Sequence, residues 1–162
     1  MRAICVALLV AACGHPTAPE GRAPVADPCS ALALGLATTA KPLAAWPAPA
    51  GCTWQPVDGV RQLTTPADLQ AALSCPSPEP PLGLDLAASS LVVTTEAWSP
   101  AQIGLRAFDD GRQVTLVRLQ RAPCAADPRP MPTPPITSAF TTTTTAPRTF
   151  ASRACTVPTT CR

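Results

Sequence analysis

The side chains with the clearest chemistry in this sequence are its cysteines. The 162-residue chain has 8 Cys, and six of them lie beyond residue 13, at Cys29, Cys52, Cys75, Cys124, Cys155 and Cys161. Zinc sites favour close pairs such as C-x-x-C, whereas the nearest two of the six, Cys155 and Cys161, have five residues between them. An even number of cysteines in an exported chain predicts disulfides, here three, and leaves fifteen connectivities open.

Groups for nucleophilic or acid–base catalysis are sparse. A nucleophilic Ser or Cys needs a neighbouring base, and the only histidine, His15, stands in a proline-rich stretch near the N-terminus. Hydrolysis by a pair of carboxyl groups is the remaining kind of catalysis to consider. Asp68 fits a helix cap, however, and Asp58-Gly59 and Asp109-Asp110-Gly111 are typical of turns. The acidic candidates are Asp58, Asp68, Asp85, Glu96, Asp109 and Asp110. We therefore predict no enzyme activity, no metal and no cofactor.

Two further groups of side chains could bind a partner. Arginines cluster on a predicted hairpin and could hold an anion, although solvated charges at a sheet edge are the simpler interpretation. Three tryptophans could line a groove or fill the core. These residues are Arg106, Arg112, Arg118 and Arg121, and Trp46, Trp54 and Trp98. A net charge of only +2 excludes a nucleic-acid binder that neutralises many phosphates.

The first thirteen residues, MRAICVALLVAAC, have the parts of a secretory signal. Arg2 precedes an apolar run, Ala3–Ala12, and small residues lead to Cys13. The run is ten residues long, too short to cross a bilayer as a helix. We expect residues 1–12 to be a signal peptide.

The tetrad Val10-Ala11-Ala12-Cys13 resembles the lipobox of bacterial lipoproteins. In that family the cysteine receives a diacylglycerol, the peptide is cut before it, and the new amino terminus is usually acylated. The resemblance implies that Cys13 is the lipid-bearing first residue and that the membrane is a partner through this lipid. Gly14 stands where many inner-membrane lipoproteins carry Asp, which implies the outer membrane; the exposed face stays open.

The lipid is expected to be followed by a spacer and one domain. Residues 13–28 contain four prolines and almost no large apolar side chain, which predicts an extended tether. Residues 29–162 are expected to form a single small domain, and 22 Pro in the chain exclude regular structure from end to end. Residues 29–40 are ambiguous between a short helix and a strand, and residues 41–51 are expected to be a loop.

One helix and one hairpin are expected in this domain. Thr65 as N-cap and Pro66 at the first position predict a helix over residues 66–73. Strands 102–108 and 112–121 flank a predicted two-residue turn, Asp110-Gly111.

This turn would place Asp109 opposite Arg112, Ala107 opposite Val114 and Leu105 opposite Leu116. Ile103 would lie on the same core face, with Gln102, Arg106 and Thr115 on the exposed face.

The remaining runs complete a β-rich fold. Residues 91–95, 136–145 and 150–157 are further expected strands, and the second of them contains five consecutive threonines. We predict a mainly β fold, an antiparallel meander or a small sandwich or barrel, with one short helix and stabilising disulfides.

Residues 60–122 have a looser resemblance to a second family. TPADLQAAL, Leu84-Asp85-Leu86, LVV and the DDG hairpin are similar to the C-terminal domain of the accessory subunit of a bacterial surface protease complex, and to small lipoproteins that share it. The resemblance implies a short helix, an Asp-containing strand and a meander, and no catalytic residues.

The expected function is that of a lipid-anchored cell-envelope lipoprotein with a binding or structural role toward another envelope protein. The alternative is a regulator or inhibitor of an envelope protease, which the second resemblance suggests.

Overall fold

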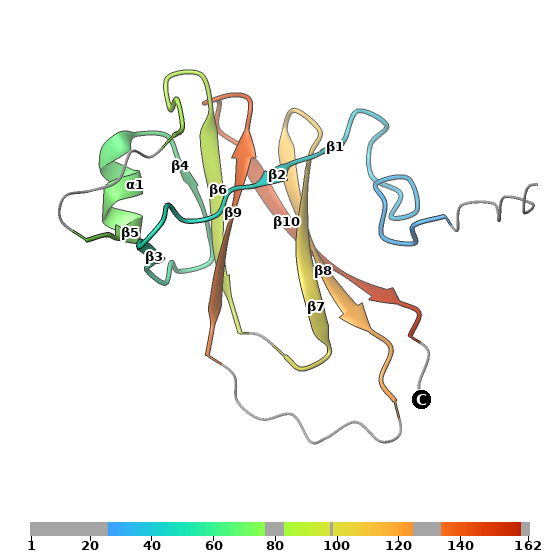
Figure 1. The fold of residues 1–162 in the computed structure, drawn as a ribbon. Coiled ribbons are helices and arrows are strands. Elements are labelled where there is room, and N and C mark those ends of the chain that lie inside the picture. Colours follow the sequence, from blue (N-terminus) through green and yellow to red (C-terminus); the bar gives the residue numbers. More distant parts are fainter. Residues whose placement is uncertain (1–25, 77–82, 98, 125–133, 160–162) are drawn as a thin grey trace, which may run out of the picture.

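Two four-stranded sheets make up most of the domain in the computed structural model, which describes residues 26–76, 83–97, 99–124 and 134–159 (Figure 1). The first sheet has the order β1 (Lys41–Pro42), β7 (Gln102–Asp109), β8 (Gln113–Arg121) and β10 (Thr149–Val157). The second has the order β2 (Ala44–Ala45), β9 (Ile136–Thr142), β6 (Ser90–Glu96) and β4 (Val60–Leu63). A small ribbon pairs β3 (Thr53–Trp54) with β5 (Leu73–Ser74), and the helix α1 spans Pro66–Ala72.

The predicted fold class is therefore confirmed: the described chain is mainly β, with one short helix and disulfides. The pairing is less regular than a meander, because β6 pairs with β4 and β9 and not with β7. One pair of the described strands is parallel: β10 runs alongside β8 from Thr149 opposite Gln113 to Val157 opposite Arg121. Parallel neighbours need a long connection, and here that connection passes through β9 in the other sheet.

Successive side chains along each strand point to opposite faces of the sheet, so buried side chains lie on both faces. Val92 of β6 packs with Leu116 of β8 and Phe140 of β9 where the sheets meet. The neighbouring Leu91 and Val93 point the other way, into the cluster beneath α1. All of β6 from Ser90 to Thr94 is buried, which explains its nearly continuous apolar sequence.

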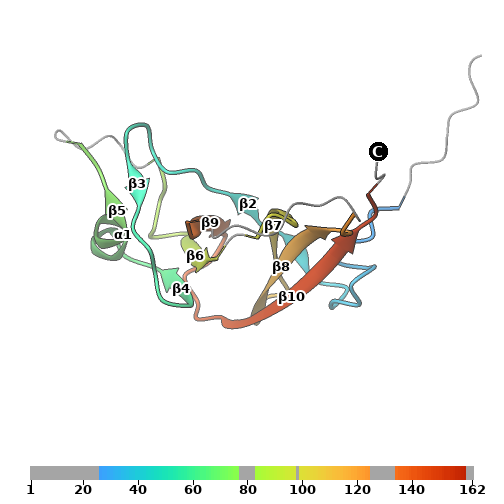
Figure 2. The same cartoon turned by 90° about the horizontal axis from the view of Figure 1, so that it is seen from below.

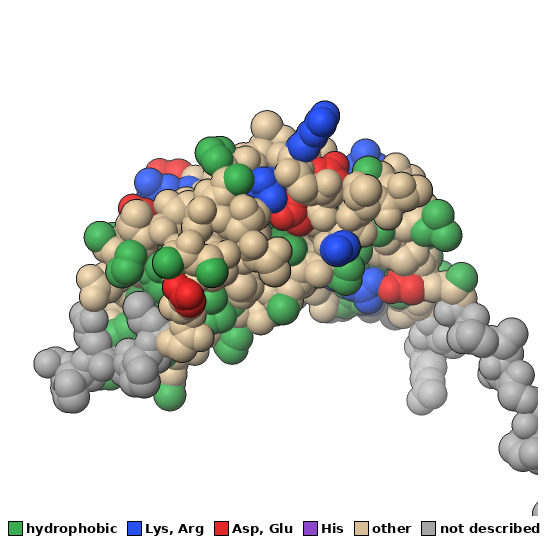
Figure 3. Space-filling model, turned by 90° about the horizontal axis from the view of Figure 1, so that it is seen from above, with side chains coloured by type: hydrophobic (Ala, Val, Ile, Leu, Met, Phe, Trp, Pro, Cys, Tyr) green, Lys and Arg blue, Asp and Glu red, His purple; other side chains and the backbone are tan. Residues whose placement is uncertain are grey.

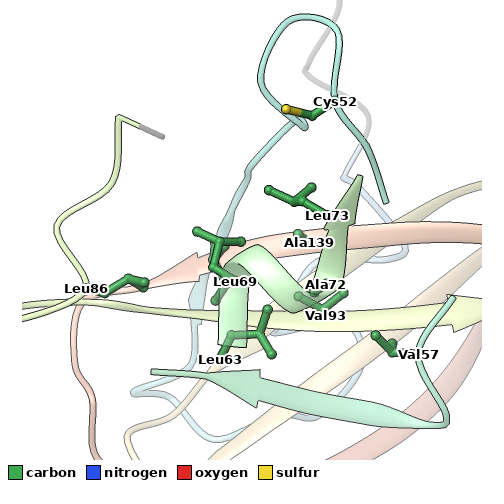
Figure 4. Close-up of a cluster of buried hydrophobic side chains, with 10 residues drawn as sticks. Cys52, Val57, Leu63, Leu69, Ala72, Leu73, Leu86, Val93 and Ala139 are labelled. Atoms are coloured by element: carbon green, nitrogen blue, oxygen red, sulfur yellow. The ribbon is translucent and has the colours of Figure 1, made fainter. Parts of the chain in front are cut away.

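Helix α1 covers the second sheet. Leu69 and Ala72 lie in one buried cluster with Leu63 of β4 and Val93 of β6 (Figure 4). The helix begins as predicted: Thr65 is the N-cap and its hydroxyl oxygen accepts a hydrogen bond from the Asp68 N–H at 3.1 Å. It ends one residue before the expected position, because Leu73 is extended and belongs to β5.

We expect Thr65→Ala to lower the free energy of unfolding by about 1 kcal/mol, since the variant leaves a helix N–H without its cap. Thr65→Ser keeps the hydroxyl and should restore most of the loss. Denaturant unfolding of the three proteins measures the difference. Equal stability of Thr65→Ala and the wild type would contradict the role of the cap.

The hairpin register differs from the predicted one by two residues. Asp109 lies opposite Val114 and Ala107 opposite Leu116, because the chain turns over residues 110–112 before β8 begins at Gln113. The Asp110 carboxylate accepts hydrogen bonds from the backbone N–H groups of Arg112 and Gln113, each at 2.8 Å. Gly111 supplies the positive φ of +95° that this turn requires.

The exposed face predicted for this hairpin is largely covered, and of its three predicted residues only Arg106, with a side chain 43% exposed, remains half-exposed. Gln102 and Thr115 are 5% and 6% exposed. Residues 29–40 form turns, neither a helix nor a strand, and their apolar side chains pack on Phe108 and Val117. Ile103, expected in the core, is 52% exposed because a bulge between Gln102 and Gly104 shifts the pairing.

Two disulfides have both of their cysteines among the described residues, one at the segment 29–40 and one at the β3–β5 ribbon. Cys29–Cys155 joins the segment 29–40 to β10, with a sequence separation of 126. Cys52–Cys75 ties the small ribbon together beside α1, with a separation of 23. Cys124 is also disulfide-bonded. Cys161 and Cys13 lie outside the described residues.

Seen along the strands, the molecule is an arch (Figure 2). Strands β8 and β10 lie on the convex side, and the segment that carries β1 and β2 crosses the hollow side. Figure 3 shows the arch from the opposite end, with hydrophobic side chains along the inner side of the half that carries α1, β3 and β5.

Candidate functional site

The segment 41–48, called the bridge below, connects the two sheets on the hollow side of the arch. Its β1 pairs with β7, and after Leu43 its β2 pairs with β9. The Leu43 N–H donates to the Ala107 carbonyl at 2.9 Å, and the Trp46 N–H donates to the Ala139 carbonyl at 2.8 Å. Because the bridge crosses from one sheet to the other, it leaves a groove on each side. The expectation of a plain loop over residues 41–51 was wrong for this part.

The first groove, called the polar groove, has a volume of about 640 Å³, within the range of ligand sites. Asp109 and Arg148 form an ion pair at its floor, with Nε to Oδ1 at 3.1 Å and side chains 12% and 9% exposed. Arg148 also donates its backbone N–H to Gln62 Oε1, so it links the hairpin to β4. The residues that line the polar groove are Thr39, Lys41, Pro42, Leu43, Ala44, Asp109, Asp110, Gly111, Thr141, Thr143 and Arg148.

The carboxyl of Asp110, which lines the polar groove, has a lowered pKa. The backbone N–H groups of Gln113 and Arg112 hold the pKa of Asp110 below its ordinary value of 3.8, with a smaller effect from nearby positive charge. A folded-state pKa below the unfolded one means that the carboxylate stabilises the fold above about pH 4. This stability is lost as the pH falls through the lowered pKa.

We therefore expect Asp110→Asn to flatten the acid limb of the stability profile. The wild type should lose unfolding free energy more steeply between about pH 4 and pH 2 than the variant does. Thr39→Val is the control, because it removes the Thr39 hydroxyl contact to the Asp110 carbonyl and introduces no titrating change. Parallel acid limbs for the wild type and Asp110→Asn, in denaturant titrations at each pH, would refute the assignment.

The second groove, called the apolar groove, has a volume of about 610 Å³ and no charged lining residue. Trp46 of the bridge meets Trp54 of β3 edge to face, with ring centroids 5.6 Å apart and planes at 67°. Both rings are half-buried, so they form a wall and not only core. The lining residues are Ala45, Trp46, Pro47, Ala48, Trp54, Leu105, Ile136, Thr137, Ser138, Ala139 and Phe140.

The candidate carboxylates mostly have local structural contacts. Asp68 lies in the first turn of α1, where it accepts a hydrogen bond from the Thr65 hydroxyl. Asp85 lies in a turn, not a strand, and accepts the Ala87 N–H at 2.9 Å. Asp58 is exposed in another turn, and Glu96 lies 3.5 Å from the Gln102 side-chain amide. Only Asp109 and Asp110 share a groove.

The four arginines do not form one patch. Arg106 points to the covered face, where it forms an ion pair with Asp27 that, with the Cys29 N–H, lowers the pKa of the Asp27 carboxyl. Arg118 alternates with Val117 and so projects from the opposite face. Arg112 is exposed in the turn, and Arg121 Nε lies 3.5 Å from the Pro100 carbonyl. The structure therefore does not bring these four side chains together as one anion-binding cluster.

The sequence named Trp46 and Trp54 among residues that could line a groove, and both do line the apolar groove. It did not locate either groove, since both depend on contacts between the bridge and strands far along the chain. A second local signal is Pro47, which has no N–H and ends the pairing of the bridge with β9. Trp98 and His15 lie outside the described residues. Within the described ranges, no group of three or more His, Cys, Asp or Glu could hold a metal ion.

Comparisons with protein-family models, curated proteins and solved structures find no match to the chain. In the part of the chain that the structure describes, no helix is both long and apolar enough to cross a membrane. The function is therefore argued from the grooves and the N-terminal sequence.

Proposed function

We propose that the protein is a lipid-anchored lipoprotein of the bacterial outer membrane. We also propose that its domain binds another protein of the cell envelope. The observation that carries the binding role is the apolar groove, an uncharged hollow of about 610 Å³ walled by Trp46 and Trp54. Hollows of this size with aromatic walls and few polar groups are typical of recognition sites.

The anchor half of the proposal rests on the sequence. The lipobox-like tetrad ends at Cys13, and the proline-rich residues after it would hold the domain away from the headgroups. Two or three acyl chains hold a protein at a bilayer essentially permanently. The disulfides Cys29–Cys155 and Cys52–Cys75 fit an oxidising compartment.

Membrane fractionation and affinity capture test the two halves separately. Cys13→Ala is expected to release the protein from the membrane fraction, and a full chain tagged at its C-terminus is expected to retain a stoichiometric envelope protein after mild detergent extraction. A porin or other structural protein in that position supports the binding role. A protease there would support the regulator instead, and Cys13→Ala remaining membrane-bound would overturn the anchor.

A further inference from the structure

Among the described residues, no strand pairs with the edges of β7 and β9 where they flank the apolar groove. The Ala139 carbonyl accepts a hydrogen bond from Trp46, so the backbone groups of Ala139 face the bridge and not β6. By the alternation of an antiparallel strand, those of Thr137 face the same way. The register of β2 against β9 would continue with Pro47 beside Ser138 and Ala48 beside Thr137, but β2 ends at Ala45 and Pro47 has no N–H.

The edge of β7, on the other side of the apolar groove, also has backbone groups that face the bridge. The Ala107 carbonyl accepts a hydrogen bond from the Leu43 N–H, so Ala107 turns its backbone groups toward the bridge. Leu105, two residues earlier on β7, then presents its N–H and carbonyl to the groove. Leu105 and Thr137 thus line the apolar groove from two strands whose pairing partner, the bridge, has turned away toward β3 (Figure 1).

We infer that the apolar groove is a β-augmentation site, in which an extended, uncharged segment of another envelope protein pairs with the free edge of β9 at Thr137. Main-chain hydrogen bonds to a strand edge supply affinity in this mode of recognition, and pockets for alternate side chains supply specificity. The Trp46–Trp54 wall offers the apolar pocket.

The side chains that line the apolar groove indicate which kind of peptide segment can bind there. Exposed strand edges are usually protected by charged side chains, and none lines this groove. A Lys or Arg side chain that entered it would lose hydration without an opposite charge to pair with. An uncharged segment avoids that cost, and the half-exposed Ile136 at the open end extends the apolar surface for it. The inference rests on the proposed function, because the occupant is a protein of the envelope.

The bridge supplies a matched pair of test positions. Ala44 and Ala45 are adjacent, both exposed and both in β2, but Ala44 lines the polar groove and Ala45 lines the apolar groove. A photo-reactive benzoylphenylalanine at position 45 of the full chain in living cells is expected to cross-link to a partner through a peptide of uncharged residues. The same probe at position 44 is expected to give little of this product. Hydrogen exchange of the captured complex should show protection of the Thr137 amide.

Substitution at the same two positions completes the test. Ala45→Lys should reduce the captured complex more than about tenfold, since it places a charge in the groove, whereas Ala44→Lys should leave it unchanged. Undiminished capture by Ala45→Lys would overturn the groove inference and leave the proposed function standing. A cross-link from position 45 to lipid or to a second copy of the chain would also overturn it. Loss of every partner in both variants and in the wild type would overturn both proposals.

Discussion

Replacing Cys29 and Cys155 together by serine is expected to lower the free energy of unfolding by about 5 kcal/mol. The bond closes a loop with a sequence separation of 126, and the loop-entropy model assigns a cross-link of that length nearly 5 kcal/mol. Small domains have about 5–15 kcal/mol in all, so the double variant should be largely unfolded at physiological temperature. The segment 29–40 should leave β8 at the same time, because this bond fastens it.

The second disulfide is the internal control. Cys52–Cys75 has a separation of 23, for which the same model gives about 3 kcal/mol. Guanidinium unfolding of the wild type and of both double-serine variants gives the comparison. A smaller loss from the Cys29–Cys155 pair than from the Cys52–Cys75 pair would show that the segment 29–40 is not a stabilising part of the domain.

Leu116→Ala is expected to cost about 3–4 kcal/mol, the next largest effect. Leu116 is 0% exposed and lies in β8, where it packs with Val92 of β6 and Phe140 of β9. Truncation leaves a cavity between the two sheets, which the rigid β8–β10 and β6–β9 pairs cannot easily close.

Leu32→Ala is its control, because Leu32 is 87% exposed and makes no core contact among the described clusters. The control should lie within about 0.5 kcal/mol of the wild type. Equal stabilities for Leu116→Ala and Leu32→Ala, from unfolding curves in the same denaturant, would mean that the sheets do not share a core at β8.

Local signals in the sequence predicted local structure well. Thr65 and Pro66 located the start of α1, and Asp110-Gly111 located the hairpin, since caps and turns depend on residues a few positions apart. The hairpin register failed because the Asp110 carboxylate binds two backbone N–H groups and so lengthens the turn, a choice that alternation alone does not reveal.

Features that depend on distant contacts could not be predicted in the same way. Phe108 and Val117 are buried by the segment 29–40, which precedes them by more than sixty residues. The parallel β8–β10 pair and the disulfide pairing depend on the whole topology. The apolar groove, the main candidate site, exists only because the bridge pairs with both sheets and stops at Pro47.

One measurement tests the lipid anchor and the disulfides together: the intact mass of the protein from native membranes, alkylated before and after reduction. We predict a species that begins at Cys13, carries added fatty-acyl mass, and gains six alkylated thiols only after reduction. An unlipidated full-length chain whose cysteines alkylate without reduction would contradict the envelope location, and with it the proposed function.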